Sequence, residues 1–228
     1  MQEPELGVVS QEQERLRAEA PPILVEVAPS PLLRLDLGCG HRPRDGFEGV
    51  DLHSPSAKHK VDLFRFPFPW ADRSVEALLS SHFIEHLPAR DVEERDLVLE
   101  GSGHREIRQE FIGKDFLYAF MDECHRILAP GGTFLVIVPN QSWDGAYQDP
   151  THRRFLNQNT FLYFNRTQRE QMGVDLYSRA SCDFMISQMT PVGPEDFALR
   201  AAEVQERAFK HYRNTVYEWH ITLQKKSE

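Results

Sequence analysis

The stretch Leu32-Leu33-Arg34-Leu35-Asp36-Leu37-Gly38-Cys39-Gly40 decides how this chain folds. Its leucine-rich first half predicts a buried β-strand over residues 32–37, and the two glycines that follow predict a tight turn. A second strand at 47–52 closes on another acidic residue, Asp51. A strand, a glycine turn and a second strand that ends on an acid form the unit with which α/β sheets hold an adenosine-bearing cofactor.

Strands and helices alternate beyond this unit. The best helix is predicted at 115–128, where apolar residues recur at spacings of three and four and Pro130-Gly131-Gly132 ends the pattern. A second helix is expected at 194–212. The predicted strands lie at 32–37, 47–52, 60–63, 75–80, 133–138, 183–189 and 215–224. This order predicts an α/β fold with a doubly wound, Rossmann-like sheet of seven strands and an antiparallel C-terminal edge.

The chain is expected to form one domain, 32–228, behind an N-terminal tail and cover segment, 1–31. The tail is rich in Glu and Gln and contains a candidate surface helix at 11–20, before prolines break the chain. Residues 89–114 are strongly charged and carry Gly101-Ser102-Gly103 in their middle, which predicts an insertion into the core.

Composition narrows the class of protein. The 228 residues carry a formal net charge of −9, which argues against a nucleic-acid substrate because such substrates need a basic surface. Three sparse cysteines fit a reducing compartment. The first ten residues show no secretory signal, and no apolar run approaches the ~18 residues of a membrane span. We therefore expect a cytoplasmic protein that does not enter membranes.

The glycine turn and two strand-end acids predict the ligand. A dinucleotide site needs a third glycine before a helix, but His41-Arg42-Pro43 follows Gly40 here, which favours a ligand without a pyrophosphate. Asp51 stands where a carboxylate can accept both ribose hydroxyls. Asp62, at the end of the expected strand 60–63, can accept an adenine amino proton. The two glycines alone also fit a plain β-turn; the added acids make coincidence a poor explanation.

Four segments together resemble a known family. Leu35–Gly40, Gly49–Leu52, Ser81–Leu87 and Met121–Pro139 are similar to the class I S-adenosylmethionine-dependent methyltransferases, of the small-molecule, type 11-like variety with a compact seven-stranded core. The resemblance covers about 32–140. The link after the glycine turn is short for this family and leaves little room for a first helix.

The resemblance implies S-adenosyl-L-methionine as the cofactor. Gly38 and Gly40 would contact its amino-acid part, Asp51 its ribose and Asp62 its adenine, while the residues that follow the strand 75–80 would lie against its methionine side. The whole predicted cofactor site comprises Asp36, Gly38, Cys39, Gly40, Asp51, Leu52, Asp62, Leu63, Ser81 and His82.

The segment His82-Phe83-Ile84-Glu85-His86 fits the H-x-x-E-H string of some zinc peptidases. That string needs a long helix, whereas this one starts at a strand end, so the peptidase interpretation is rejected. On one helical turn His82, Glu85 and His86 share a face and could bind a divalent metal. The interpretation favoured over metal binding is that Glu85 and His86 begin and orient a helix and His82 stacks near the cofactor.

The catalytic candidates are the histidines His82, His86 and His152, because an imidazole titrates near neutral pH and can act as a general base. For His152 a plain turn at 149–152 fits equally well. The sequence thus predicts transfer of a methyl group to an oxygen or nitrogen of a small-molecule acceptor. The alternatives are another reaction of the same cofactor, aminocarboxypropyl transfer or cyclisation, and a non-catalytic cofactor-binding module.

Overall fold

The computed structural model describes residues 32–98, 110–175, 179–195, 197 and 199–227. All of them belong to one compact unit that begins at Leu32. The predicted tail with its candidate helix at 11–20 lies outside the described residues, as does the central part of the predicted insertion, 99–109. Within the described ranges, no helix has the length and apolarity needed to cross a membrane.

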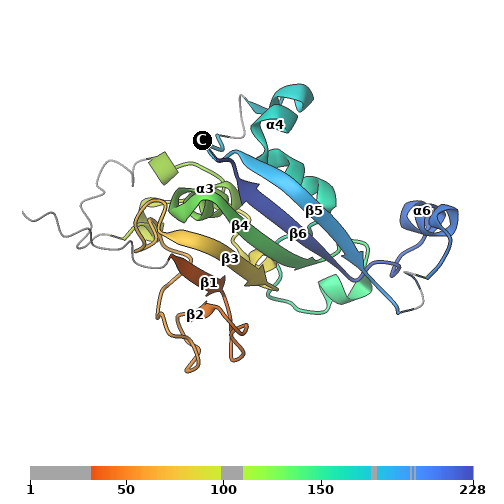
Figure 1. The fold of residues 1–228 in the computed structure, drawn as a ribbon, viewed down its shortest axis with the longest axis horizontal. Helices are drawn as coiled ribbons and strands as arrows, with labels where there is room; N and C mark the ends of the chain where they lie inside the picture. Colours follow the sequence, from red (N-terminus) through yellow and green to blue (C-terminus); the bar gives the residue numbers. More distant parts are fainter. Residues whose placement is uncertain (1–31, 99–109, 176–178, 196, 198, 228) are drawn as a thin grey trace, which may run out of the picture. The chain divides into compact units, whose positions relative to one another are not determined.

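The described residues form one six-stranded sheet in the order β2-β1-β3-β4-β6-β5 (Figure 1). Strands β2, β1, β3 and β4 are parallel, and β6 runs antiparallel between β4 and β5. The strands are β1 (Leu33–Leu37), β2 (Glu48–Val50), β3 (Val75–Ser81), β4 (Leu128–Pro139), β5 (Phe184–Val192) and β6 (Glu218–Lys225). The predicted α/β sheet with an antiparallel C-terminal edge is confirmed.

The sheet winds outward in both directions from β1. Asp36 of β1 pairs with Gly49 of β2 on one side and with Leu79 of β3 on the other. Strand order therefore reverses at β1. In open α/β sheets, ligands bind outside the carboxyl ends of the strands at such a reversal. The segments that follow β1, β2 and β3 consequently share the position where a ligand is expected.

The predicted strand at 60–63 is wrong. Between β2 and residue 63 the described chain makes a single isolated bridge, from Val50 to His59. It then turns at Asp62, whose Oδ1 accepts a hydrogen bond from the Phe64 N–H at 2.9 Å. A carboxylate that binds its own backbone two residues later favours a turn over a strand. The described sheet accordingly has six strands where seven were predicted.

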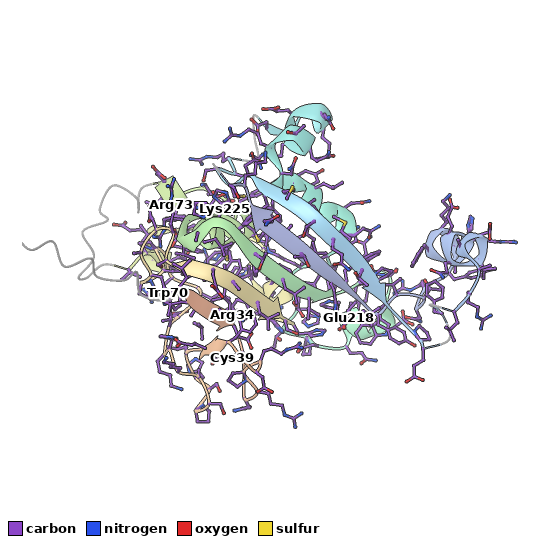
Figure 2. The ribbon with its side chains drawn as sticks, viewed as in Figure 1. Arg34, Cys39, Trp70, Arg73, Glu218 and Lys225 are labelled. Carbon is purple, nitrogen blue, oxygen red and sulfur yellow. The ribbon has the colours of Figure 1, made fainter. Side chains whose placement is uncertain are left out.

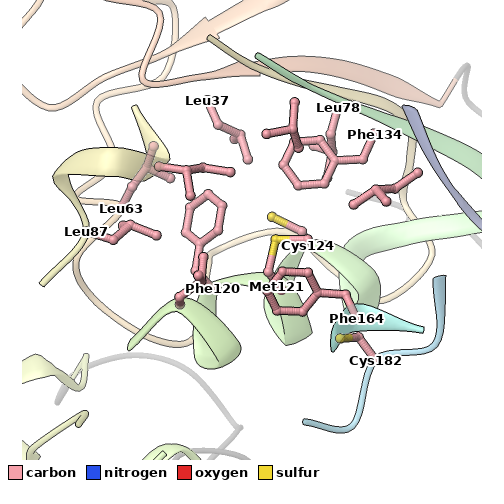
Figure 3. Packing of buried hydrophobic residues seen from close by; sticks show 14 of the residues in the cluster. Leu37, Leu63, Leu78, Leu87, Phe120, Met121, Cys124, Phe134, Phe164 and Cys182 are labelled. Carbon is pink, nitrogen blue, oxygen red and sulfur yellow. The ribbon is translucent and has the colours of Figure 1, made fainter. Parts of the chain in front are cut away.

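The predicted helix at 115–128 is confirmed as α3 (Phe116–Ile127). Asp115 caps it by accepting a hydrogen bond from the Leu117 N–H at 2.9 Å. Figure 3 shows Phe120, Met121 and Cys124 of α3 pointing at apolar side chains of the sheet. These sheet residues are Leu37, Leu78 and Phe134, all buried in the same cluster. The apolar stripe read from the sequence is thus the face that anchors α3 to β1, β3 and β4.

Two of the described connections lack a full helix. The link from β1 to β2 contains no helix, as its length predicted, and β3 is followed by a single 3₁₀ turn, η1 (Ile84–His86), rather than by a full helix. The second predicted helix is shorter than expected. The other helical segments are η2 (Glu94–Asp96), η3 (Asp144–Tyr147), η4 (Gln158–Phe164), α4 (Arg166–Met172) and α6 (Ala202–His211).

Candidate functional site

The glycine turn after β1 lies directly under an aromatic ring. Gly38 and Gly40 have φ angles of +74° and +53°, a backbone region that glycine adopts readily. A Cβ atom on Gly38 would lie 2.3 Å from a ring carbon of Phe83. Only glycine fits at this point, because both the backbone conformation and the close approach of the ring exclude a side chain.

Asp51 ties this turn to the end of β2. Its Oδ1 accepts hydrogen bonds from the N–H groups of His53 and Ser54, both at 2.8 Å, and its Oδ2 accepts one from the Gly40 N–H at 3.2 Å. Burial raises the pKa of Asp51, but these backbone hydrogen bonds outweigh it and hold the pKa below its usual value. Asp51 is therefore a charged group whose position is fixed by the backbone, with acceptor capacity left on Oδ2.

Five predicted cofactor residues meet at one cleft beside this turn. The cavity measures about 130 Å³, below the ~300–1,000 Å³ usual for ligand pockets. The stacked rings of Phe64 and Phe83, with centroids 5.8 Å apart, form part of its wall. The lining residues are Gly38, Asp51, Leu52, His53, Val61, Asp62, Leu63, Phe64 and Phe83. The two phenylalanines were not predicted as part of the site.

Three other predicted cofactor residues at the turn, Asp36, Cys39 and Gly40, do not line the cleft. Asp36 is buried and accepts a hydrogen bond from the Arg44 N–H at 2.9 Å, while burial raises its pKa. Burial, followed by the charges of Asp36 and Asp51, raises the pKa of Cys39 to about 11. The Cys39 thiol is thus neutral and unreactive at physiological pH.

At the end of β3, His82 turns toward the C-terminal strand. Its Nε2 lies 2.9 Å from Oε2 of Glu218, the first residue of β6. Figure 2 labels Glu218 at the end of the sheet opposite Arg73 and Lys225. The His82 Nδ1 lies 3.4 Å from Oε1 of Glu85. Glu218 and then Glu85 raise the pKa of His82 to about 9. His82 therefore carries a proton at neutral pH. The sequence did not single out Glu218, which lies 136 residues away.

Glu85, in η1, is a buried carboxylate without hydrogen bonds. The residue is 0% exposed, and neither carboxylate oxygen has a hydrogen-bond partner in the described structure. His152 Nε2 approaches Oε1 only to 3.9 Å. The Glu85 backbone carbonyl, in contrast, accepts hydrogen bonds from the N–H groups of Arg153 and Arg154, at 2.8 and 3.0 Å. These bonds hold the loop that carries His152 against η1.

The second and third predicted catalytic histidines lie next to this carboxylate. The rings of His86 and His152 meet edge to face with centroids 4.8 Å apart. One potential ligand atom from each of Glu85, His86 and His152 lies within 4.8 Å of the others. The structure thus groups Glu85 and His86 as predicted, but with His152 in the place that the sequence assigned to His82. The H-x-x-E-H string identified two of the three residues.

A larger cavity of about 670 Å³ lies beside the loop that follows His152. Its walls come from Ala89, from the N-terminal turn of α3 and from the continuous stretch 153–164, which includes η4. They include the aromatic rings of Tyr118 and Tyr163 and the ion pair between Arg154 and Asp115, 3.0 Å long. Sequence reasoning missed this cavity, because three separated segments build it.

Comparison with solved structures identifies the fold. No protein-family model matches the chain, and no curated protein matches its sequence. A SAM-dependent methyltransferase from Archaeoglobus fulgidus superposes with a TM-score of 0.51 and 17% sequence identity, over 85% of this chain and 86% of that chain. This chain has the class I S-adenosylmethionine-dependent methyltransferase fold.

Two further solved structures are less similar. An S-adenosylmethionine dependent methyltransferase from Mesorhizobium loti shares 16% identity over 94% of this chain and 97% of that chain, with a TM-score of 0.43. A geranyl diphosphate C-methyltransferase from Streptomyces coelicolor shares 14% identity over 86% of this chain and 70% of that chain, with a TM-score of 0.41. Within the methyltransferase fold, the described part of this chain departs from expectation in its missing strand at 60–63.

Proposed function

We propose that this protein is a methyltransferase that uses S-adenosyl-L-methionine to methylate an oxygen or nitrogen of a small molecule. The observation that carries the proposal is the cleft at the reversal of strand order, where Gly38, Asp51 and Asp62 meet in a methyltransferase fold. The fold alone does not fix the chemistry. The proposal therefore depends on how the cleft residues suit the cofactor.

The donor and acceptor groups of the cleft suit an adenosine. Asp51 keeps acceptor capacity on Oδ2 for a ribose hydroxyl, and Asp62 faces the same cavity from the next turn. Leu52 and Leu63 supply apolar walls for a flat base. A volume of about 130 Å³ admits part of such a ligand, so we expect the Phe83 ring to move off Gly38 when the cofactor binds.

The bound cofactor would supply a methyl group on a positively charged sulfur, which is already activated for transfer. The protein then has to align the acceptor with the methyl group and, for some acceptors, remove a proton. With its pKa near 9, His82 suits binding a negatively charged or carbonyl group rather than taking up a proton. His86 and His152 remain the candidates for acting on the acceptor. The cavity of about 670 Å³ beside the His152 loop offers room for it.

Calorimetric titration of the full chain with S-adenosylmethionine tests the proposal. We expect binding in the wild type and a loss of affinity of tenfold or more in Asp51→Ala. Because Asp51 also holds the glycine turn, thermal unfolding must show that the variant is folded. Glu206→Ala on α6 is the matched control, since its exposed carboxylate lies outside the cleft, and it should bind like the wild type. Absence of binding, or equal binding by Asp51→Ala, would reject the proposal.

Product analysis separates the alternatives. S-adenosylhomocysteine is the product of methyl transfer, whereas methylthioadenosine marks aminocarboxypropyl transfer or cyclisation. Binding with no turnover of any acceptor tested would favour a non-catalytic module.

A further inference from the structure

We propose that Glu85, His86 and His152 form a binding site for a divalent transition-metal ion of the Zn²⁺ class. This set differs from the one that the H-x-x-E-H string predicted, because His82 is replaced by His152. The site uses the two histidines that are also the candidates for acting on the acceptor, but metal binding there can be tested without cofactor or acceptor.

The first argument is the state of the Glu85 carboxylate. Burying a charged carboxylate without hydrogen-bond donors is strongly unfavourable, and buried charges in proteins are normally paired or bound to metals. Both oxygens of Glu85 lack hydrogen bonds in a residue that is 0% exposed. His82 makes only a long ion pair with Oε1, at 3.4 Å, and its Nε2 is directed at Glu218 at 2.9 Å, so Oε2 of Glu85 has no hydrogen-bond partner among the described residues. A bound cation would satisfy both oxygens.

The second argument is the orientation of His152. Its Nδ1 lies 2.7 Å from the Ala146 carbonyl oxygen, which can only accept a hydrogen bond. The proton of the neutral ring is therefore on Nδ1, and the lone pair is on Nε2, the atom 3.9 Å from the Glu85 carboxylate. A histidine that donates one ring N–H to a backbone carbonyl and offers the other nitrogen is the usual arrangement of a metal ligand.

The third argument is a hydrogen-bond chain behind His86. The Thr151 hydroxyl donates to Oδ1 of Asp149 at 2.6 Å, so it can accept a hydrogen bond from His86 Nδ1, 3.0 Å away. His86 is then also protonated on Nδ1 and presents the lone pair of Nε2. The two histidines are thus held by different outer partners in the same tautomer.

The set of ligands indicates the kind of ion. Two imidazoles and one carboxylate suit Zn²⁺, Co²⁺ or Fe²⁺, whereas Mg²⁺ and Ca²⁺ prefer oxygen ligands. Ligand atoms around one such ion lie roughly 3–4 Å apart, and here they lie within 4.8 Å of one another. A contraction of about 1 Å would close the site. Three protein ligands leave a coordination position open, as in catalytic rather than structural zinc sites.

Titration of the metal-stripped full chain with Zn²⁺ by calorimetry, and with Co²⁺ by visible absorption, tests the proposal. We expect one ion per chain, a Co²⁺ spectrum typical of a site with nitrogen ligands, and Mg²⁺ binding at least 100-fold weaker than Zn²⁺. No binding of Zn²⁺ or Co²⁺, or several weak sites per chain, would overturn the proposal.

Variants show whether these three residues are the ligands. Glu85→Gln keeps the size of the side chain and should weaken Zn²⁺ binding at least 100-fold, as should His152→Gln. Thr151→Val removes the partner of His86 from an exposed position and should weaken binding several-fold in a folded protein. His82→Gln should not weaken binding, because it removes a positive charge 3.4 Å from Glu85. The exposed His211→Gln on α6 is the matched control and should bind within about threefold of the wild type. Loss of binding in His82→Gln with no effect of His152→Gln would instead support the set read from the sequence.

Discussion

Two carboxylates near the carboxyl ends of the parallel strands have opposite surroundings. Asp51, after β2, accepts three hydrogen bonds from backbone N–H groups and lies at the edge of a cleft. Glu85, after β3, is fully buried and accepts none on its side chain. The first carboxylate is complete without a ligand, and its role is to hold a turn and present one remaining lone pair. The second has one long ion pair, to His82 at 3.4 Å, and no hydrogen bond, which leaves it acceptor capacity for the proposed cation. The proposed sites for an uncharged sugar and for a metal ion thus differ in the number of donors that the protein itself supplies to the carboxylate.

The strongest test of this difference between Asp51 and Glu85 is a matched pair of neutral substitutions in metal-free protein. Asp51→Asn should lower the free energy of unfolding by about 1.5–3 kcal/mol, since the amide cannot accept from all the backbone donors that the carboxylate satisfies. Glu85→Gln should raise it by about 1 kcal/mol, because it removes a buried carboxylate that accepts no hydrogen bond, while His82 keeps its closer ion pair with Glu218.

Chemical denaturation measures both changes. Adding Zn²⁺ at 100 times its dissociation constant should stabilise the wild type by about 2.7 kcal/mol and leave Glu85→Gln unchanged. If both substitutions destabilised the metal-free protein equally, the contrast between the two carboxylates would be lost.

A second prediction concerns the partner of His82. In metal-free protein, Glu218→Gln should lower the pKa of His82 from about 9 toward 6.5, because Glu218 is the main cause of the shift. A raised histidine pKa stabilises the folded state below the unfolded pKa, and this stabilisation disappears as pH rises through 9. The wild type should therefore lose stability between pH 6.5 and 9, and the variant should lose less.

NMR titration of the His82 ring gives the pKa directly. A value that stayed near 9 in Glu218→Gln would show that Glu85 is the main partner of His82, and the surroundings of Glu85 would need a different account. His220→Gln is the control, since its ring also contacts Glu218, at 2.7 Å, without touching His82.

The smallest expected effect concerns the cleft. Phe83→Leu removes the ring that lies over Gly38, so binding of S-adenosylmethionine should tighten by about three- to tenfold if the ring has to move. Losing the ring contacts with Phe64 and Phe120 should also lower the free energy of unfolding by about 1–2 kcal/mol. Calorimetry and thermal unfolding measure the two effects. Weaker binding in a folded variant would mean that the ring contacts the cofactor rather than blocking it.

The sequence predicted the parts of the molecule that local patterns encode. The spacing of apolar residues predicted the buried face of α3, and the glycines predicted the turn at Gly38. Asp51 was singled out because it stands at the end of a predicted strand. The strand at 60–63 was wrong because the Asp62 side chain binds its own backbone, which short-range patterns of hydrophobicity do not show.

The composition of the Glu85 cluster could not be predicted from the sequence. Glu85 and His86 are adjacent, but His152 joins them from a loop 66 residues further along, and only the folded chain shows that His82 turns away toward Glu218. The burial of Glu85 likewise depends on how the folded chain packs, because the sequence alone predicts that an acidic residue next to a histidine is exposed.

The hydrogen bonds from the Arg153 and Arg154 N–H groups to the Glu85 carbonyl join the two segments of this cluster through backbone atoms alone. Such hydrogen bonds do not depend on which side chains the two segments carry. Evolution or an engineer could therefore exchange the residues at 85, 86 and 152 for other donor atoms while the loops keep their separation. The same backbone would then hold side chains that bind different ions, or side chains that bind none.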